Sequence, residues 1–194
     1  MGTGVASPQD VVLALLVRDG PAHGYVVNKR LTADFGGRSP AYKALARLVD
    51  VGGVEEIDVR HGAGRGAPQV VFGVTDAGRT RCETWMRSEL PDLEAAAELT
   101  TRMRYARPED LPVLLALADA EIARLGARQA ALREEQQRRR RQRAQRLGPQ
   151  PSAAEVAELL DEQRVDDLLL LQVKWLTRAA GDIERLIEDG GPQA

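Results

Sequence analysis

The sequence predicts a mainly α-helical protein, α+β in its first half and an antiparallel helical hairpin in its second. Three observations predict it. Apolar residues recur at helical spacing through most of the 194 residues. Two short runs rich in Val and Ile, at 54–59 and 69–74, flank a Gly-rich segment and indicate a β-hairpin. A Gly-Pro-Gln-Pro turn at 148–151 separates two long helical stretches, which are therefore expected to fold back on each other.

The composition is that of a globular chain, with 43% hydrophobic and 29% charged residues. No apolar run reaches the length of a membrane span, and the first residues lack the pattern of a signal peptide. Cys82 is the single cysteine, so no disulfide forms within one chain. We therefore expect a soluble cytoplasmic protein with no membrane partner.

Four helices are expected in residues 1–90. The first covers about 8–17. The second covers about 22–33 and offers Tyr25, Val26 and Leu31 to a core. The third starts with Ser39 as N-cap and Pro40 as first helical residue, and runs to residue 50. The fourth follows the hairpin at about 75–88, capped by Thr75, with Trp85 and Met86 facing inward.

The third helix separates into an apolar stripe and a short polar face. The stripe is formed by Ala41, Ala44, Leu45 and Leu48. The opposite face carries Lys43 and Arg47 one turn apart, with Ser39, Ala46 and Asp50. Such a helix can enter a DNA major groove, where Lys or Arg reaches guanine or phosphate oxygens. Taken alone, it also fits a solvated surface helix.

The order of elements favours DNA binding. Three helices followed by a β-hairpin is the plan of a winged helix-turn-helix, whose third helix enters the major groove. The Gly-rich tip of the hairpin carries Arg60, His61 and Arg65, which suit contacts to phosphates. The net charge of −2 gives no such indication, because an acidic excess occupies residues 148–194. The prediction therefore depends on local basic residues.

The second half is expected to be helical, with a connector at 93–105 and long helices at 108–147 and 152–189. The last helix carries two adjacent apolar stripes. One is formed by Leu169, Val173, Leu176, Ala180, Ile183 and Ile187, and the other by Leu168, Leu171, Trp175, Ala179 and Leu186. One antiparallel helix covers only one of them, so we predict a homodimer. The predicted division is a DNA-binding domain at 1–90 and a dimerisation and effector domain at 91–194.

An arginine-rich run at 138–146 allows two interpretations. It can bind nucleic acid. Alternatively, the turn at 148–151 folds it against acidic residues, with Arg141 level with Glu158 and Arg138 level with Asp161. The second interpretation is favoured, because cations are also stabilised toward a helix C-terminus.

No pattern typical of an enzyme, a metal site or a cofactor site is present. His23, His61 and Cys82 have no metal-ligand spacing. A Cys–His dyad from Cys82 is conceivable, but a buried cysteine is the favoured interpretation. Trp85 and Trp175 could stack on a planar ligand or pack in a core or interface.

Three motifs resemble the PadR family of transcriptional regulators. His23-Gly24-Tyr25 after Gly20-Pro21 is similar to the opening of its second helix. Residues 40–48 (PAYKALARL) resemble its recognition helix, and residues 75–79 (TDAGR) the segment after its wing. The resemblance covers about residues 8–90 well. The C-terminal hairpin with Lys174-Trp175-Leu176 is more loosely similar to the dimerisation region of the longer members.

The resemblance implies a homodimeric repressor on a pseudo-palindromic double-stranded operator, released by a small, often phenolic, molecule. By position, Tyr25 and Tyr42 would contact the DNA backbone, and Lys43 and Arg47 the groove. Lys43 replaces the usual proline of the family, and Ala46 stands where lysine is frequent. The alternative function is a helical protein–protein interaction module, or a small-molecule sensor, without DNA binding.

Overall fold

The computed structural model describes residues 6–35, 40–60, 69–91, 94–146 and 152–190. The chain divides into two compact units, Met1–Leu114 and Leu115–Ala194. Within the described ranges, no helix is both long and apolar enough to cross a membrane. The functional boundary expected at residue 90 stays a prediction.

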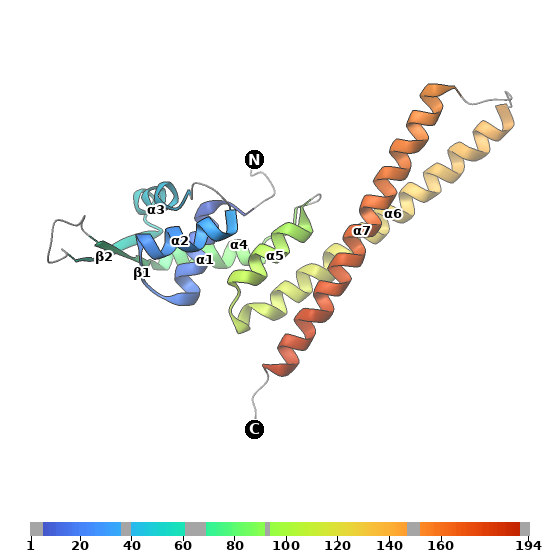
Figure 1. Cartoon of the computed structure of the whole chain (residues 1–194). Coiled ribbons are helices and arrows are strands. Elements are labelled where there is room, and N and C mark those ends of the chain that lie inside the picture. Colours follow the sequence, from blue (N-terminus) through green and yellow to red (C-terminus); the bar gives the residue numbers. More distant parts are fainter. Residues whose placement is uncertain (1–5, 36–39, 61–68, 92–93, 147–151, 191–194) are drawn as a thin grey trace. The chain divides into compact units, whose positions relative to one another are not determined.

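Unit 1 is a winged helix-turn-helix, which confirms the predicted fold class. Its helices and strands follow in the expected order (Figure 1), and their bounds are α1 (Pro8–Asp19), β1 (Ala22–His23), α2 (Gly24–Phe35), α3 (Ala41–Asp50), β2 (Val54–Arg60), β3 (Gln69–Val74), α4 (Asp76–Arg87), α5 (Ala95–Tyr105) and the 3-10 turn η1 (Pro108–Asp110).

The sheet has a third strand that the sequence did not predict. Its order is β1-β3-β2, and all neighbours are antiparallel. Ala22 and His23, expected as the start of the second helix, pair instead with Phe72 and Val71 of β3. A two-residue strand is too short to show the alternation that identifies strands in a sequence. It forms only through pairing with β3, which is distant along the chain.

The core of unit 1 is centred on α1, where every side chain from residue 11 to 16 is buried. The stripe predicted on the third helix is confirmed, since Ala41, Ala44, Leu45 and Leu48 are all buried in α3. On α2 the expectation was wrong for two residues. Tyr25 and Val26 are exposed, and Val27 and Leu31 enter the core. Gly24, Val27 and Leu31 lie at i, i+3 and i+7 and form the buried face of α2, whereas Tyr25 and Val26 lie off this face.

The start of α3 also differs from the prediction. The N-cap position is Pro40 rather than Ser39, and Pro40 makes no side-chain hydrogen bond to the helix. Instead, the Pro40 carbonyl accepts the backbone N–H of Ala44 at 2.9 Å, which begins the helical ladder. Ser39 lies outside the described residues.

The junction between α3, β2 and α4 is held by a threonine and two glycines. The Thr75 hydroxyl accepts the Gly78 N–H at 3.1 Å as the N-cap of α4, and donates to the Gly52 carbonyl at 2.6 Å. Gly52 has φ +70°, a left-handed conformation that favours glycine. This junction fixes where β2 leaves the end of α3.

Unit 2 contains α7 (Ala153–Asp189) and the long helix α6 (Leu111–Arg146) from Leu115 onward, and the two helices run antiparallel and side by side (Figure 1). Ser152 caps α7 as predicted, in a reciprocal capping box with Glu155. The predicted fold-back is confirmed by ion pairs Arg139–Glu162, at 2.9 Å, and Arg133–Asp166, at 3.3 Å. The expected levels of Arg141 with Glu158 and Arg138 with Asp161 correspond to this register within two residues.

The two apolar stripes of α7 differ in exposure. Leu169, Leu176, Ala180 and Ile183 of the first stripe are buried. In the second stripe Ala179 is buried, whereas Leu171 is 63% exposed and Trp175 37% exposed, with Leu168 and Leu186 about half exposed. One chain therefore leaves an apolar strip of α7 in contact with solvent.

Candidate nucleic-acid interface

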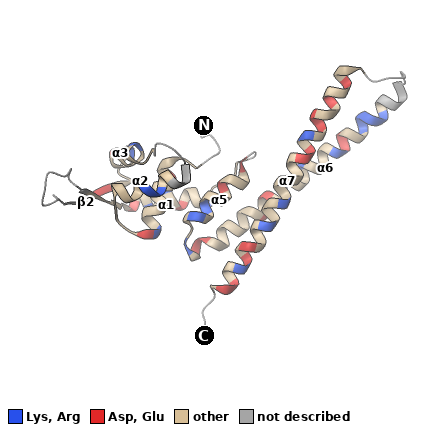
Figure 2. Cartoon of the chain, viewed as in Figure 1, with Lys and Arg blue, Asp and Glu red and all other residues tan. Residues whose placement is uncertain are grey.

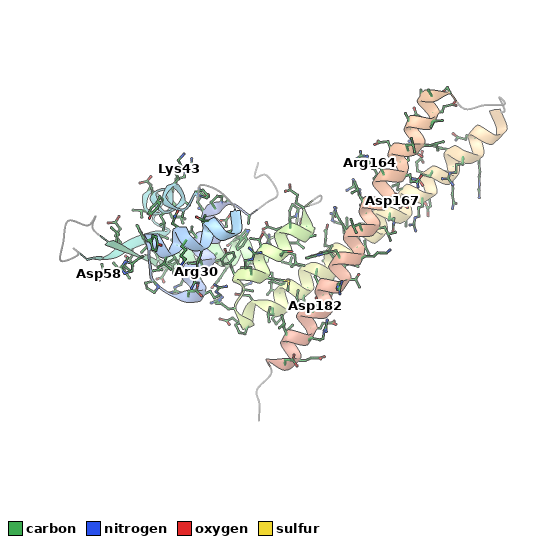
Figure 3. The ribbon with its side chains drawn as sticks, viewed as in Figure 1. Arg30, Lys43, Asp58, Arg164, Asp167 and Asp182 are labelled. Carbon is green, nitrogen blue, oxygen red and sulfur yellow. The ribbon has the colours of Figure 1, made fainter. Side chains whose placement is uncertain are left out.

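The polar side of α3 is the part of unit 1 best suited to a groove. Tyr42, Lys43 and Arg47 are all exposed there. Within the described residues, neither Lys43 nor Arg47 forms an ion pair, so both cations remain available. Figure 3 shows Lys43 projecting outward from α3. Because the opposite stripe is buried in the core, the helix cannot rotate to withdraw these side chains.

Tyr42 is seated against the start of α2. A Cβ atom added at Gly24 would lie 3.3 Å from Cε1 of Tyr42 and 3.2 Å from Cε2 of Phe72. Glycine at this position thus lets α2 begin directly beside both rings. The Tyr42 side chain nevertheless stays 56% exposed, which leaves much of it accessible to a partner.

Helix α2 adds a second set of exposed residues. Tyr25, which is 68% exposed, and Lys29 lie one turn apart on the same side of the helix. Arg30 is engaged elsewhere, because it forms an ion pair with Asp19. Hydrogen bonds from Arg18, and the charges of Arg18 and Arg30, hold the pKa of the Asp19 carboxyl below its usual value despite partial burial. Lys29 was not predicted from the sequence, although its i+4 spacing from Tyr25 could have indicated it.

The structure describes the strands of the hairpin but not the basic residues predicted at its tip. Arg60 is the last residue of β2, and His61 and Arg65, predicted at the wing tip, lie outside the described residues. The exposed side chains of β2 include Glu55 and Glu56, which are acidic. Figure 2 shows acidic colouring on β2 and basic colouring on α3.

Trp85 belongs to a buried polar cluster between α4 and α5. Its indole N–H donates to Oε1 of Glu98 at 2.8 Å, and the Arg102 guanidinium lies 5.4 Å from its ring centre. Arg102 also donates to Glu98 at 3.0 Å and to the Ser88 carbonyl at 2.6 Å. Burial lowers the pKa of Arg102, and the hydrogen bond to Glu98 opposes this shift. The prediction that Trp85 faces inward holds only in part, because the residue is half-buried.

A role for Trp85 or Trp175 in ligand binding stays a prediction. Unit 2 has an open cavity of about 600 Å³, lined by Gln136, Arg140, Leu159, Glu162, Gln163, Asp166 and Asp167. Trp175 is not among these residues and lies instead on the exposed strip of α7.

Cys82 has the environment of a packing residue. It is buried on α4, and burial raises the pKa of its thiol to about 11. The thiolate, which is the nucleophilic form, is therefore scarce at neutral pH. Among the described residues, no group of three or more His, Cys, Asp or Glu side chains is placed to hold a metal ion.

Comparison with known proteins gives one family match. Residues 12–84 match the model of the Transcriptional regulator PadR-like family. This range runs from α1 to α4 and includes the three-stranded sheet. A comparison with curated protein sequences gives no significant match.

Several solved structures resemble the chain in outline. Bacillus subtilis PadR in complex with operator DNA has 16% identity and a TM-score of 0.38, covering 90% of this chain and 98% of that chain. Its complex with p-coumaric acid has 15% identity and a TM-score of 0.36, covering 92% and 99%. A PadR-like regulator from Bacillus cereus has 18% identity and a TM-score of 0.35, covering 92% and 99%. At scores this low, no property of those proteins is carried over.

The likeness to this family rests on the sequence match and agrees with the three motifs described above. The match contains the His23-Gly24-Tyr25 motif, all of α3 and the Thr75–Gly78 cap. Residues 12–84 of the chain are thus similar to the PadR-like family of transcriptional regulators.

Proposed function

We propose that this protein is a cytoplasmic, sequence-specific DNA-binding repressor that acts as a homodimer on a pseudo-palindromic operator. The observation that carries the proposal is the face of α3, where Lys43 and Arg47 stand exposed and without ion pairs among the described residues, one turn apart. Arg and Lys are the side chains that most often read guanine in the major groove. The match of residues 12–84 to a family of transcriptional regulators supports the same conclusion.

Within this proposal, the exposed residues of α2 and α3 have two different roles. Lys43 and Arg47 of α3 reach base edges. Tyr25, Tyr42 and Lys29 bind the phosphate backbone and fix the register of α3 in the groove. Ser39, Arg60, His61 and Arg65 remain proposed contacts because of their places in the sequence, just before α3 and at or after the end of β2.

The proposed dimer is formed through α7. Its exposed strip consists of Leu168, Leu171, Trp175 and Leu186, beside the stripe that the same chain buries. A second copy of α7 offers the same strip, and an isologous pairing covers both. Covering apolar area is worth about 25 cal/mol per Å² before the entropy of association is subtracted.

We further propose that a small planar or phenolic effector releases the operator. The support is the partly exposed indole of Trp175, which lies on the strip assigned to the dimer. Quenching of Trp175 emission by such a compound, measured in a Trp85→Phe background, checks this step, and unchanged emission across a broad set of planar compounds would count against it.

Arg47→Ala is expected to weaken operator binding by about 1–3 kcal/mol, the usual range for a side chain that reads a base. The operator is first selected from bound genomic fragments, and affinities are then measured by mobility shift. Arg87→Ala serves as the matched control, because Arg87 is an exposed arginine at the end of α4 with only a weak ion pair to Glu83. Equal operator affinities for the two variants would show that Arg47 of α3 does not contact the operator.

A further inference from the structure

The exposed side of α7 carries charged residues at both ends of its apolar strip. Positions spaced alternately three and four residues apart form one row along this side, which is the heptad spacing of a helix that pairs with another helix. Every residue of the row is exposed or partly exposed. We name this set the outer row, and in chain order it consists of Asp161, Arg164, Leu168, Leu171, Trp175, Arg178, Asp182 and Arg185.

The two ends of the outer row are ion pairs that lie open to solvent. Arg164 pairs with Asp161 at 2.8 Å, and both side chains are 67% exposed. Arg185 pairs with Asp182, and these side chains are 72% and 48% exposed. Each pair has i,i+3 spacing, with the acid first and the base second along the chain. The two ends therefore present the same charge pattern, on either side of an apolar centre.

This pattern is complementary to itself when a second copy of α7 runs in the opposite direction. With the two-fold axis between Leu171 and Trp175, Leu171 faces the partner's Trp175, as core positions do in antiparallel helix pairs. The same step of seven residues outward from each brings Arg164 opposite the partner's Asp182. Three residues further, Asp161 lies opposite the partner's Arg185. Opposite charges thus meet at both ends while the apolar centres cover each other.

A parallel pair of α7 helices would not have this complementarity. In a symmetric parallel pair each residue of the outer row faces its own copy, so Arg164 would face the partner's Arg164, and Asp182 the partner's Asp182. Like charges in such positions disfavour the pairing. The charges therefore select the antiparallel orientation.

Neighbouring antiparallel registers are also less favourable. A shift of one heptad toward the N-terminus sets Asp182 against the partner's Ala157 and keeps one opposite-charge contact at each end, between Asp161 and Arg178. A shift of one heptad toward the C-terminus sets Leu171 against the partner's Asp182, which leaves a carboxylate on the apolar centre. Only the register centred between Leu171 and Trp175 matches two opposite charges at each end.

We propose that α7 pairs with α7 of a second copy in the antiparallel orientation, in the register that sets Arg164 against the partner's Asp182. This inference rests on the proposed function for the existence of the homodimer, and it adds the orientation and the register. Leu168, Leu171 and Trp175 supply the apolar area that is covered. The charged ends select the partner geometry by repelling the alternatives.

A charge exchange between Arg164 and Asp182 tests the register. These residues are 18 positions apart on one helix, or about 27 Å, so their side chains do not meet within a chain (Figure 3). The dimer dissociation constant of the full-length protein is measured by sedimentation equilibrium for the wild type, Arg164→Glu, Asp182→Arg and the exchange variant Arg164→Glu/Asp182→Arg. Circular dichroism verifies that each variant keeps its helical content.

The matched control for the exchange is Arg164→Glu/Glu184→Arg, which has the same net charge. Glu184 is exposed and lies two residues beyond Asp182, on another side of α7. Its reversal therefore supplies a cation that the partner's residue 164 does not meet.

We expect each single reversal to raise the dissociation constant about tenfold or more at low salt, because a two-fold dimer contains every contact twice. The exchange variant is expected to return within about threefold of the wild type, although its own i,i+3 pairs remain broken, and the control to stay as weak as Arg164→Glu. Single reversals without effect, or an exchange variant no stronger than the control, would overturn the inference and leave the proposed homodimer intact. A wild type that stays monomeric at all concentrations would overturn both.

Discussion

Arg102→Ala is expected to lower the free energy of unfolding of unit 1 by about 3–5 kcal/mol. The reason is the buried Glu98 carboxylate, whose side chain is 4% exposed and whose Oε1 is bound by Arg102 and Trp85. Its Oε2 has no hydrogen-bond partner among the residues that the structure describes. Loss of the guanidinium would leave a buried negative charge with only the indole N–H, and would also free the Ser88 carbonyl.

Two further variants separate the effect of burial from that of charge. Arg87→Ala breaks the exposed Arg87–Glu83 pair, which has the same i,i+4 spacing on α4, and is expected to cost under about 0.5 kcal/mol. Glu98→Gln/Arg102→Met removes both charges and is expected to recover much of the lost stability. Urea titrations followed by circular dichroism provide the comparison. If Arg102→Ala were as mild as Arg87→Ala, the buried cluster would not join α4 to α5 as described.

Gly78→Ala is expected to destabilise unit 1 by about 2–4 kcal/mol, through the backbone shift that over-packing demands. A Cβ at this position would lie 2.0 Å from the Gly53 carbonyl oxygen and 2.8 Å from Cγ2 of Val74. The carbonyl is backbone and cannot rotate away, and the Thr75 N–H also holds it, at 3.2 Å. The turn between α3 and β2 would have to separate from α4.

The matched control is Gly126→Ala on α6, where an added Cβ has no atom within 4 Å. Alanine is a better helix former than glycine by up to about 1 kcal/mol, so this variant is expected to be as stable as the wild type or slightly more stable. Thermal melts of Gly78→Ala and Gly126→Ala measure the difference in stability. Similar melting temperatures for the two alanine variants would contradict the close approach at Gly53.

The sequence predicted the elements whose causes are local. The stripe at Ala41, Ala44 and Leu48 follows from helical periodicity, and the caps at Thr75 and Ser152 follow from side-chain chemistry. The register of α6 against α7 followed from one short turn and the charges beside it. These features depend on neighbours in the sequence or on a symmetric fold-back.

The features that sequence reasoning missed depend on contacts between distant segments. The pairing of His23 with Val71 and the close approach of Gly78 to Gly53 join residues far apart in the chain. Tyr25 was expected in the core as well as at the DNA, and the structure shows it exposed because Val27 and Leu31 form the buried face of α2.

The central claim is that two copies of α3 meet successive major grooves of one duplex. Hydroxyl-radical footprinting on the selected operator tests it most directly, with the wild type and Arg47→Ala compared at equal protein concentration. The account predicts two equivalent protected half-sites with centres about one helical turn apart, or a multiple of it, both lost or weakened together in Arg47→Ala. A single unpaired protection, or a pattern that Arg47→Ala leaves unchanged, would contradict it.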